Sequence, residues 1–270
     1  MGIVRALAKR NSCYIYNFVM SNILADTVAA ARGDSVQWAS MYILKERDYV
    51  KYAVEQIERL GFKAIVLTCD HPHNRVADFT IPVFLQSGDD ESRKAMVPWN
   101  ALSYAHARGL PPPESFGTND DSLTWADVRT FIQSTRLPVI CKGILTVEAA
   151  RAALDAGAAG VYVSNHGCRQ MDCEPGAIRV LSEIVEAVGG RVPVFIDSGF
   201  RTGSQVLKAI ALGASGVMVG RPVLFGLAAA GEAGVSKALE VLDKELEYDM
   251  KGTGCCTLDG ITPHVFYQSK

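Results

Sequence analysis

The chain has 270 residues, of which 49% are hydrophobic, so it can bury one large core or two smaller ones. Its formal net charge of −2 argues against the broadly basic surface with which proteins bind nucleic acid. No apolar run reaches membrane-spanning length and the N-terminus has no signal-peptide pattern, so we expect no membrane partner and a cytoplasmic location. The ending 268–270, Gln-Ser-Lys, lacks the final Leu of a peroxisomal Ser-Lys-Leu signal.

The seven cysteines are spread along the chain in apolar or mixed surroundings. They form no Cys-x-x-Cys pair with the spacing of metal ligands, and an odd number of cysteines argues against a closed disulfide framework. We therefore expect reduced thiols and no metal site.

The first part of the chain alternates predicted helices and strands. The third of its strands is apolar enough to be buried on both faces, as in a parallel sheet. The longest helix has an apolar face at the spacing of an amphipathic helix, formed by Val50, Ala53, Val54, Ile57 and Leu60, and Gly61 ends it. The predicted elements are a helical stretch at Arg5–Lys9, strands at Cys13–Val19, Gln37–Leu44 and Ala64–Cys69, and helices at Ile23–Arg32 and Arg47–Leu60.

A long stretch from Asp70 to Asp121 interrupts this alternation. It is rich in proline, glycine and charge, and we expect it to be irregular. A connection of this length inside a compact domain is usually a lid or a binding loop, so residues 71–121 are predicted to form a long active-site loop. A loose insertion without function explains its middle section equally well.

Regular alternation resumes at Ser122. Thr146 is expected to cap one of the helices and Gly157 to end it. Parallel strands with right-handed helical crossovers predict a single α/β domain over residues 1–270, a TIM (β/α)8-type barrel that is incomplete because seven strands are recognisable where a closed barrel has eight. The elements are a helix opening at 122–125 and ending at Ser134, strands at Val139–Gly143, Gly160–Ser164, Val194–Ser198 and Gly216–Val219, and helices at Val147–Ala156, Ile178–Val188, Ser204–Ala211 and Leu239–Lys251.

The most informative segment is 160–172, GVYVSNHGCRQMD, where a short β-rich run ends abruptly in polar residues. Barrels of parallel strands carry their chemistry where strands end in this way. We expect His166 to act as a general base and Arg169 to hold a substrate anion. For a lone His the better interpretation would be a solvated turn, but other strand ends carry matching chemistry.

Two of these strand ends carry single charged residues. Lys142 ends an apolar strand in PVICKGIL, and because an unpaired buried charge is costly, its ammonium must reach water, a ligand or a partner. It could stabilise negative charge that develops on a cofactor, or it could simply extend to the rim of the barrel. Asp70 could orient the imidazole of His166, although a capping or loop role explains that position alone better.

Glycine and arginine follow the last two predicted strands, at 197–201 (DSGFR) and at 220–222 (GRP). The corresponding loops build phosphate sites in many barrels, because glycine exposes backbone N–H groups and arginine supplies a charged fork. One such turn would indicate only a solvated arginine, whereas two in successive loops favour phosphate binding. The residues alone therefore indicate a barrel that binds a phosphorylated cofactor or substrate and abstracts a proton beside an anionic group.

Taken together, SNHGCRQMD, PVICKGIL, VFIDSGFRTGSQVLKAIALGASGVMVGRP and GEAGV resemble the FMN-dependent α-hydroxy-acid oxidase and dehydrogenase family, to which glycolate oxidase belongs. The likeness is dense from Ser122 to about Cys255 and weaker from Arg5 to Asp70. It implies a flavoprotein that binds FMN and oxidises a small-molecule α-hydroxy acid to the 2-keto acid. Relatives are commonly tetramers, so a homo-oligomer is expected.

The resemblance also implies catalytic roles. His166 would be the base that takes a proton while two electrons pass to the flavin, and Asp70 would pair with it. Arg169 would hold the substrate carboxylate, Tyr42 would touch the substrate, and Arg75 would be a second substrate arginine. FMN would supply the redox chemistry and the protein the positioning.

A larger set of residues would contact FMN by the same resemblance. Lys142 would lie beside the flavin N1 and O2 and stabilise the anionic reduced form, and the two glycine-arginine turns would hold the ribityl chain and phosphate. The complete set is Lys142, Ser164, Thr68, Asp197, Gly199, Arg201, Gly220, Arg221, Ser21 and Ser40.

The chain departs from the family pattern at three points. The resemblance begins after the family's N-terminal segment and first barrel strand, which accounts for the seven strands. Ser40 stands where the family has a flavin-contacting Gln. Ser198 replaces the first glycine of the usual Asp-Gly-Gly, and it is expected to add bulk near the phosphate loop.

Two alternatives to an active FMN enzyme remain open. The first is a non-catalytic or truncated homologue, favoured by the missing strand and opposed by the presence of His166, Arg169 and Lys142. The second is another phosphate-binding barrel enzyme that uses the same two C-terminal loops, which the SNHG-x-RQ string opposes.

Overall fold

The computed structural model describes residues 1–19, 21, 24–31, 33–71, 99–110 and 119–266. The chain forms two compact units, one of Ala8–Val139 and one of Met1–Leu7 with Ile140–Lys270. The paired strands within each unit are parallel and follow the order of the sequence. Alternating helices and parallel strands confirm the predicted α/β class.

The unit of Ala8–Val139 is built on three strands, of which the third, β3, is buried along its whole length. Tyr14 pairs with Gln37 and Ala39 pairs with Ile65, which sets the register. The predicted elements are confirmed with shorter ends, and α7 is an additional helix that was not predicted. The strands are β1 (Tyr14–Asn17), β2 (Gln37–Met41) and β3 (Ile65–Thr68), and the helices are α2 (Ala25–Ala30), α3 (Arg47–Arg59), α7 (Trp99–Ala107) and α8 (Trp125–Gln133).

Helix α7 corrects the prediction that 71–121 is irregular throughout. Its buried Asn100 donates from Nδ2 to the hydroxyl of Tyr16 at 2.7 Å and to the carbonyl of Phe18 at 2.9 Å, and its Oδ1 accepts from the N–H of Ala25 at 3.2 Å. One buried amide thus ties α7 to β1 and α2. Residues 72–98 and 111–118 of the predicted loop lie outside the described residues.

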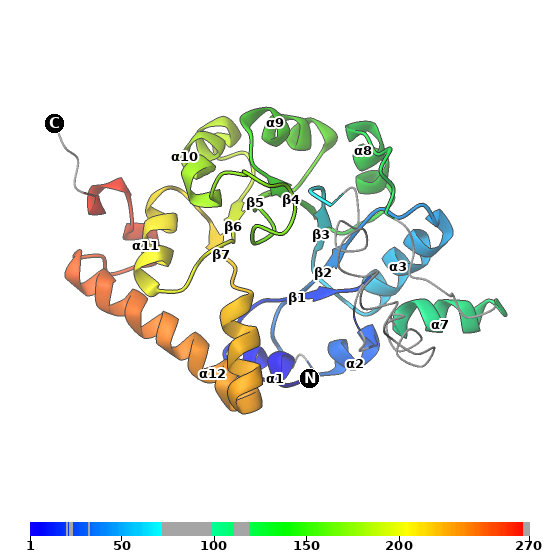
Figure 1. The fold of residues 1–270 in the computed structure, drawn as a ribbon, viewed down its shortest axis with the longest axis horizontal. Helices are drawn as coiled ribbons and strands as arrows, with labels where there is room; N and C mark the ends of the chain where they lie inside the picture. The colour runs from blue at the N-terminus through cyan, green and yellow to red at the C-terminus, as the bar shows by residue number, and fades with distance from the viewer. Residues whose placement is uncertain (20, 22–23, 32, 72–98, 111–118, 267–270) are drawn as a thin grey trace. The chain divides into compact units, whose positions relative to one another are not determined.

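In the other unit, helices α9, α10 and α11 pack against strands β5, β6 and β7 respectively (Figure 1). The predicted cap at Thr146 accepts a hydrogen bond from the N–H of Ala149 at 3.1 Å, and Gly157 ends the helix in the left-handed conformation. The elements are β4 (Val139–Ile144), α9 (Val147–Ala156), β5 (Gly160–Val163), α10 (Ala177–Val188), β6 (Val194–Ile196), α11 (Gly203–Ala211) and β7 (Gly216–Val217).

The C-terminal helix is longer than predicted, because α12 spans Arg221–Gly252 and bends at the non-helical residues Ala230 and Gly231. Figure 1 shows its two segments at an angle to each other. Helix α1 (Gly2–Ala8) packs on α12 through Ala6, in a cluster with Val223 and Val235. Two short 3-10 turns follow, at Leu258–Gly260 and Pro263–Val265. Among the described residues, no helix is long and apolar enough to cross a membrane.

The contact between α11 and α12 depends on a glycine. A Cβ built on Gly203 would lie 2.1 Å from the backbone nitrogen of Leu246, closer than any real contact allows. We expect Gly203→Ala to lower the free energy of unfolding by about 2 kcal/mol or more, because α11 must move away from α12. Denaturant unfolding followed by circular dichroism measures this change.

Gly252→Ala is the matched control, since Gly252 lies at the end of α12 and a Cβ there would meet nothing within 4 Å. It should leave stability unchanged or raise it by up to about 1 kcal/mol, the gain of alanine over glycine in a helix. Equal effects of the two substitutions would contradict the close approach of α11 and α12.

Candidate functional site

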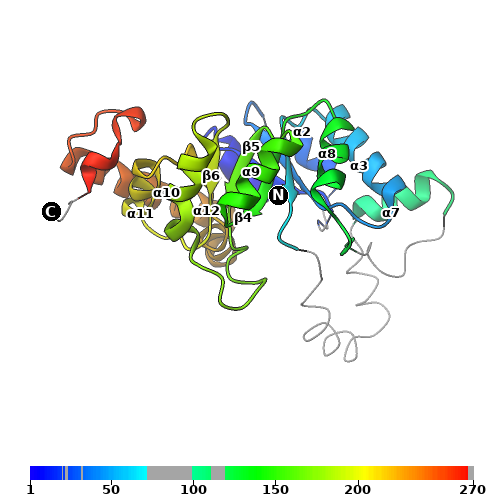
Figure 2. The ribbon, with the colours of Figure 1, turned by 90° about the horizontal axis from the view of Figure 1, so that it is seen from above.

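The loop that follows β5 carries the predicted base and anion clamp. Ser164 and Asn165 are buried, and the chain then passes through three residues with positive φ: His166 at 54°, Gly167 at 70° and Cys168 at 60°. This sharp turn brings the half-buried His166 and the exposed Arg169 to the end of the strand. Figure 2 shows the loop extending from β5 as irregular chain.

Ser198, at the end of β6, fixes this turn with its hydroxyl. The oxygen accepts hydrogen bonds from the backbone N–H of Asn165 at 3.3 Å and of Gly167 at 3.2 Å, and the hydroxyl donates to Asp197 Oδ1 at 2.7 Å. The sequence predicted only added bulk here. The hydroxyl instead joins the end of β6 to the loop that carries His166, a role that the motif pattern did not reveal.

The predicted cation lies beside the predicted base. Lys142 Nζ is 3.5 Å from His166 Nδ1 and 5.7 Å from the centre of the Tyr162 ring. An ammonium group can only donate hydrogen bonds, so this contact suits an imidazole whose Nδ1 accepts and whose proton is on Nε2. Tyr162, buried on β5, donates from its hydroxyl to Asp197 Oδ2 at 3.0 Å. Lys142, Tyr162, Asp197 and Ser198 therefore form one continuous set of contacts behind the base.

The glycine-arginine turns meet the same loop. Arg221, the first residue of α12, donates from Nη2 to the carbonyl of Gly167 at 2.7 Å, and a Cβ on Gly167 would come 2.6 Å from that nitrogen. At Gly199, with φ of 96°, and at Gly220, a Cβ would meet nothing within 4 Å. Open backbone at two glycines beside exposed arginines suits an anionic group such as a phosphate, so these residues fit the phosphate end of FMN.

Arg201 and Ser164 also lie in this unit, and each forms a hydrogen bond with a neighbouring residue. Arg201 is exposed, donates from Nη1 to the carbonyl of Phe200 at 2.8 Å, and stands just before the N-terminus of α11. Ser164 is fully buried, and its Oγ accepts a hydrogen bond from the N–H of His166 at 3.0 Å. Lys142 lies within β4, which continues to Ile144, and does not end the strand as predicted. The unit brings it together with residues that follow its strands: His166, Arg169, Ser164, Asp197, Gly199, Arg201, Gly220 and Arg221.

The remaining predicted residues belong to the unit of Ala8–Val139. Tyr42 follows β2 and Thr68 ends β3, and both line a pocket of about 220 Å³ whose lining also includes polar and apolar residues, among them His71 and Asn119. Ser40 lies on β2 and is half-buried, and Asp70 follows β3. The pairing of Asp70 with His166 stays a prediction.

Ser21 hydrogen-bonds the hydroxyl of Tyr16, an interaction that lowers the pKa of that phenol while burial raises it more strongly. Arg75 lies outside the described residues. Within the described ranges, no group of three or more His, Cys, Asp or Glu side chains is arranged to hold a metal ion.

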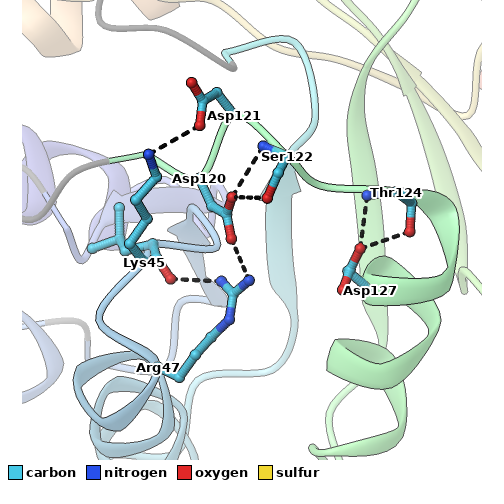
Figure 3. A network of polar contacts seen from close by, with 8 residues as sticks. Lys45, Arg47, Asp120, Asp121, Ser122, Thr124 and Asp127 are labelled. Carbon is cyan, nitrogen blue, oxygen red and sulfur yellow. Dashed lines mark hydrogen bonds and ion pairs between the residues drawn. The ribbon is translucent and has the colours of Figure 1, made fainter.

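One wall of the pocket is held by the charged network in Figure 3. Asp120 forms an ion pair with Arg47, and its Oδ1 accepts hydrogen bonds from the N–H of Ser122 at 3.0 Å and from its hydroxyl at 2.6 Å. Arg47 also donates to the carbonyl of Leu44 at 2.6 Å, and Lys45 pairs with Asp121 at 3.0 Å. The network fixes the segment before α8 to the chain between β2 and α3.

Comparison with known proteins identifies the class of protein. The family model for FMN-dependent dehydrogenases matches residues 1–268. Glycolate oxidase of Spinacia oleracea is 44% identical over 239 residues, which are 86% of this chain and 63% of the relative. A solved lactate oxidase of Pediococcus acidilactici has a TM-score of 0.84 at 33% identity, covering 97% of this chain and 69% of that one. A mandelate oxidase variant with a monooxide FMN adduct has a TM-score of 0.77 at 35% identity, covering 96% and 71%.

The chain belongs to the FMN-dependent dehydrogenase family. The resemblance inferred from the motifs is therefore confirmed, as is FMN as the cofactor of the family. The predicted fold class, a TIM-type α/β barrel with seven recognisable strands, is also confirmed. The chain spans less than two thirds of the length of the spinach relative.

Amide hydrogen exchange can test whether the Ser198 hydroxyl accepts hydrogen bonds from the loop after β5. We expect Ser198→Ala to lower the protection of the Asn165 and Gly167 amides about 10-fold, because each loses its acceptor while the backbone strain at residue 198 is retained. The Cys168 amide is an internal control, since it donates to the carbonyl of Asn165 at 2.9 Å. Unchanged protection at both amides would contradict this role of Ser198.

The Asp120 network predicts an acid-sensitive contribution to stability. Hydrogen bonds from Ser122, with further help from Arg47, lower the pKa of Asp120 from its ordinary value of 3.8. The unfolded chain therefore binds this proton at a higher pH than the folded chain. The stabilisation is complete above about pH 3.8 and is lost as the pH falls below it.

Urea unfolding between pH 7 and pH 3 tests this expectation. Asp120→Asn should be less stable than the wild type at pH 7, and the difference should shrink below about pH 4 as Asp120 becomes protonated in the wild type. Asp34→Asn, which changes an exposed carboxyl group, is the matched control. If the difference in unfolding free energy between the wild type and Asp120→Asn does not change with pH, the charge of Asp120 is not the source of the stabilisation.

Proposed function

We propose that this protein is an FMN-dependent oxidoreductase that oxidises a small α-hydroxy acid to the 2-keto acid. The single observation that carries the proposal is the arrangement at the end of β5, where Lys142 Nζ lies 3.5 Å from His166 Nδ1 on the loop that also carries Arg169. A base, a fixed cation and an anion-binding arginine are the groups that this chemistry requires. Family membership supports the same conclusion.

Each residue has a role in the proposed reaction. His166 accepts the proton that leaves the substrate, and Lys142 lies beside the imidazole at 3.5 Å from Nδ1. Arg169 binds the substrate carboxylate through two parallel hydrogen bonds and so fixes the α-carbon relative to His166. Tyr42 touches the substrate and Asp70 supports the imidazolium form of His166. Bound FMN supplies the two-electron redox chemistry.

The residues proposed to bind FMN form two groups, one along the flavin and one around the ribityl chain and phosphate. Lys142 provides positive charge where the reduced flavin would carry negative charge, with Thr68, Ser164, Ser21 and Ser40 along the flavin. The residues that hold the phosphate and the ribityl chain are Asp197, Gly199, Arg201, Gly220 and Arg221. The open space beside the backbone of the two glycines supports this assignment. A homotetramer and a cytoplasmic location stay predictions from the sequence.

The visible spectrum of the purified chain with FMN tests the proposal. Wild-type protein should retain yellow colour, and anaerobic addition of glycolate or lactate should bleach it. His166→Ala should retain the colour and bleach about 10²- to 10⁴-fold more slowly, the usual contribution of a general base. Arg169→Met should raise the hydroxy-acid concentration needed for half-maximal bleaching about 10-fold or more, since charged hydrogen bonds are lost.

Arg179→Met is the matched control, because Arg179 is an exposed arginine on α10. It should bind FMN and bleach like the wild type. Folded protein that stays colourless with excess FMN would contradict the proposal and favour a non-catalytic homologue. Coloured protein that no hydroxy acid bleaches would contradict the proposed substrate class and leave FMN binding in place.

A further inference from the structure

His71 forms a contact that the motifs did not predict. It follows β3, and its imidazole lies against Tyr42, which follows β2, with ring centres 5.4 Å apart and ring planes at 69°. This is the edge-to-face arrangement in which the positive edge of one ring meets the negative face of the other. The rotation of Tyr42 about its side-chain bonds is therefore restricted by His71.

Asn119 in turn orients His71. Its Nδ2 donates to the backbone carbonyl of His71 at 3.1 Å and lies 2.6 Å from His71 Nδ1. A carbonyl oxygen can only accept, so the nitrogen end of the Asn119 amide must face His71. Nδ1 therefore accepts the second hydrogen bond, and the imidazole in this arrangement is neutral with its proton on Nε2.

Asn119 is itself held by the chain that follows β2. Leu44 and Asn119 form an antiparallel bridge, and the adjacent Asp120 is fixed by Arg47 and Ser122 (Figure 3). The side chains of Tyr42, His71 and Asn119 all line the same pocket of about 220 Å³. The backbone at residue 119 is thus fixed, and the Asn119 amide orients the imidazole of His71. The imidazole in turn packs against the ring of Tyr42 at the pocket wall.

We propose that His71, oriented by Asn119, is a positioning residue that sets the ring of Tyr42 for contact with the hydroxy-acid substrate. This inference rests on the proposed function, in which Tyr42 touches the substrate. His71 acts through Tyr42 rather than on the substrate, and its role requires the accepting Nδ1 and the flat edge of the ring. Asn119 is also required, because without the Asn119 amide the imidazole of His71 loses the hydrogen bond that fixes the orientation of the ring.

The first test compares kinetics of anaerobic flavin bleaching in the FMN-loaded full chain. His71→Ala should lower kcat/KM for the hydroxy acid about 3- to 10-fold, the effect of losing one aromatic pair. Asn119→Leu should lower it in the same direction by releasing the imidazole. His71→Phe, which keeps a ring edge against Tyr42, should recover part of the loss. His106→Ala, which removes an exposed histidine on α7, is the matched control and should change nothing.

The second test asks whether His71 acts through Tyr42. In a Tyr42→Phe background, where the phenol hydroxyl is absent, His71→Ala should cause little further loss. A purely structural role of His71 would instead give the same fold-loss in both backgrounds. Equal losses, or no loss on substituting His71 alone, would overturn the inference while wild-type bleaching still supports the proposed function.

A third measurement does not depend on activity. In protein without added FMN, the aromatic resonances of Tyr42, assigned by comparison with Tyr42→Phe, should shift in His71→Ala and in Asn119→Leu but not in His106→Ala. Unshifted resonances would overturn the contact itself. If wild-type protein binds FMN but no hydroxy acid bleaches it, the proposed function fails, and the inference fails with it even where the resonances shift.

Discussion

The left-handed turn after β5 is the constraint on which the candidate site depends. A positive φ costs an L-residue about 1 kcal/mol or more, and two non-glycine residues, His166 and Cys168, adopt it in succession around Gly167. Bonds from several elements compensate this cost. Ser164 and Ser198 accept from the turn, Arg221 donates to it, and the Asn165 side chain bonds back to the N–H of Cys168 at 3.2 Å. Because these partners come from different strands and from α12, the turn has little freedom to relax.

This arrangement places chemical groups before any ligand is bound. Lys142 lies over the face of the Tyr162 ring, and the Tyr162 hydroxyl donates a hydrogen bond to Asp197. Asp197 also accepts a hydrogen bond from Ser198, and Ser198 in turn holds the turn that carries His166. The cation and the base are therefore set by one series of contacts rather than by their own bond, which at 3.5 Å is long. Groups held in this way need no reorganisation when charge develops beside them, which is the physical source of electrostatic catalysis.

The sequence predicted elements well where a single local rule decides the structure. Thr146 and Gly157 bound α9 as expected, because capping and left-handed termination depend on the residues themselves. The apolar face of α3 was predicted except that Tyr49 is buried and Leu60, beyond the last helical residue, is only half-buried. Helix α7 was missed because Asn100 holds it through contacts with residues distant in the sequence.

The same distinction applies to the candidate site. Residues with charged or glycine side chains at strand ends could be selected from sequence, because parallel strands gather such ends at one edge. Ser198, His71 and Asn119 could not, since each acts on another protein group and nothing in its local pattern marks it. The bend in α12 at Ala230 and Gly231 likewise has no local proline, and its first segment was not recognised as helix.

At position 198, where the chain departs from a family motif, the cost of the backbone conformation is offset by new hydrogen bonds. The φ of 75° at this position is a value that glycine adopts without cost, and glycine is what the motif pattern expects there. Serine at this φ costs about 1 kcal/mol or more, but its hydroxyl makes three hydrogen bonds, each worth about 0.5–1.5 kcal/mol net. Serine therefore has a less favourable backbone conformation than glycine at this position but gains hydrogen bonds. Two of these bonds are made to the loop that carries the predicted base. Ser198, which was predicted only to add bulk near the phosphate loop, is therefore better explained as a support for the loop that carries the predicted base.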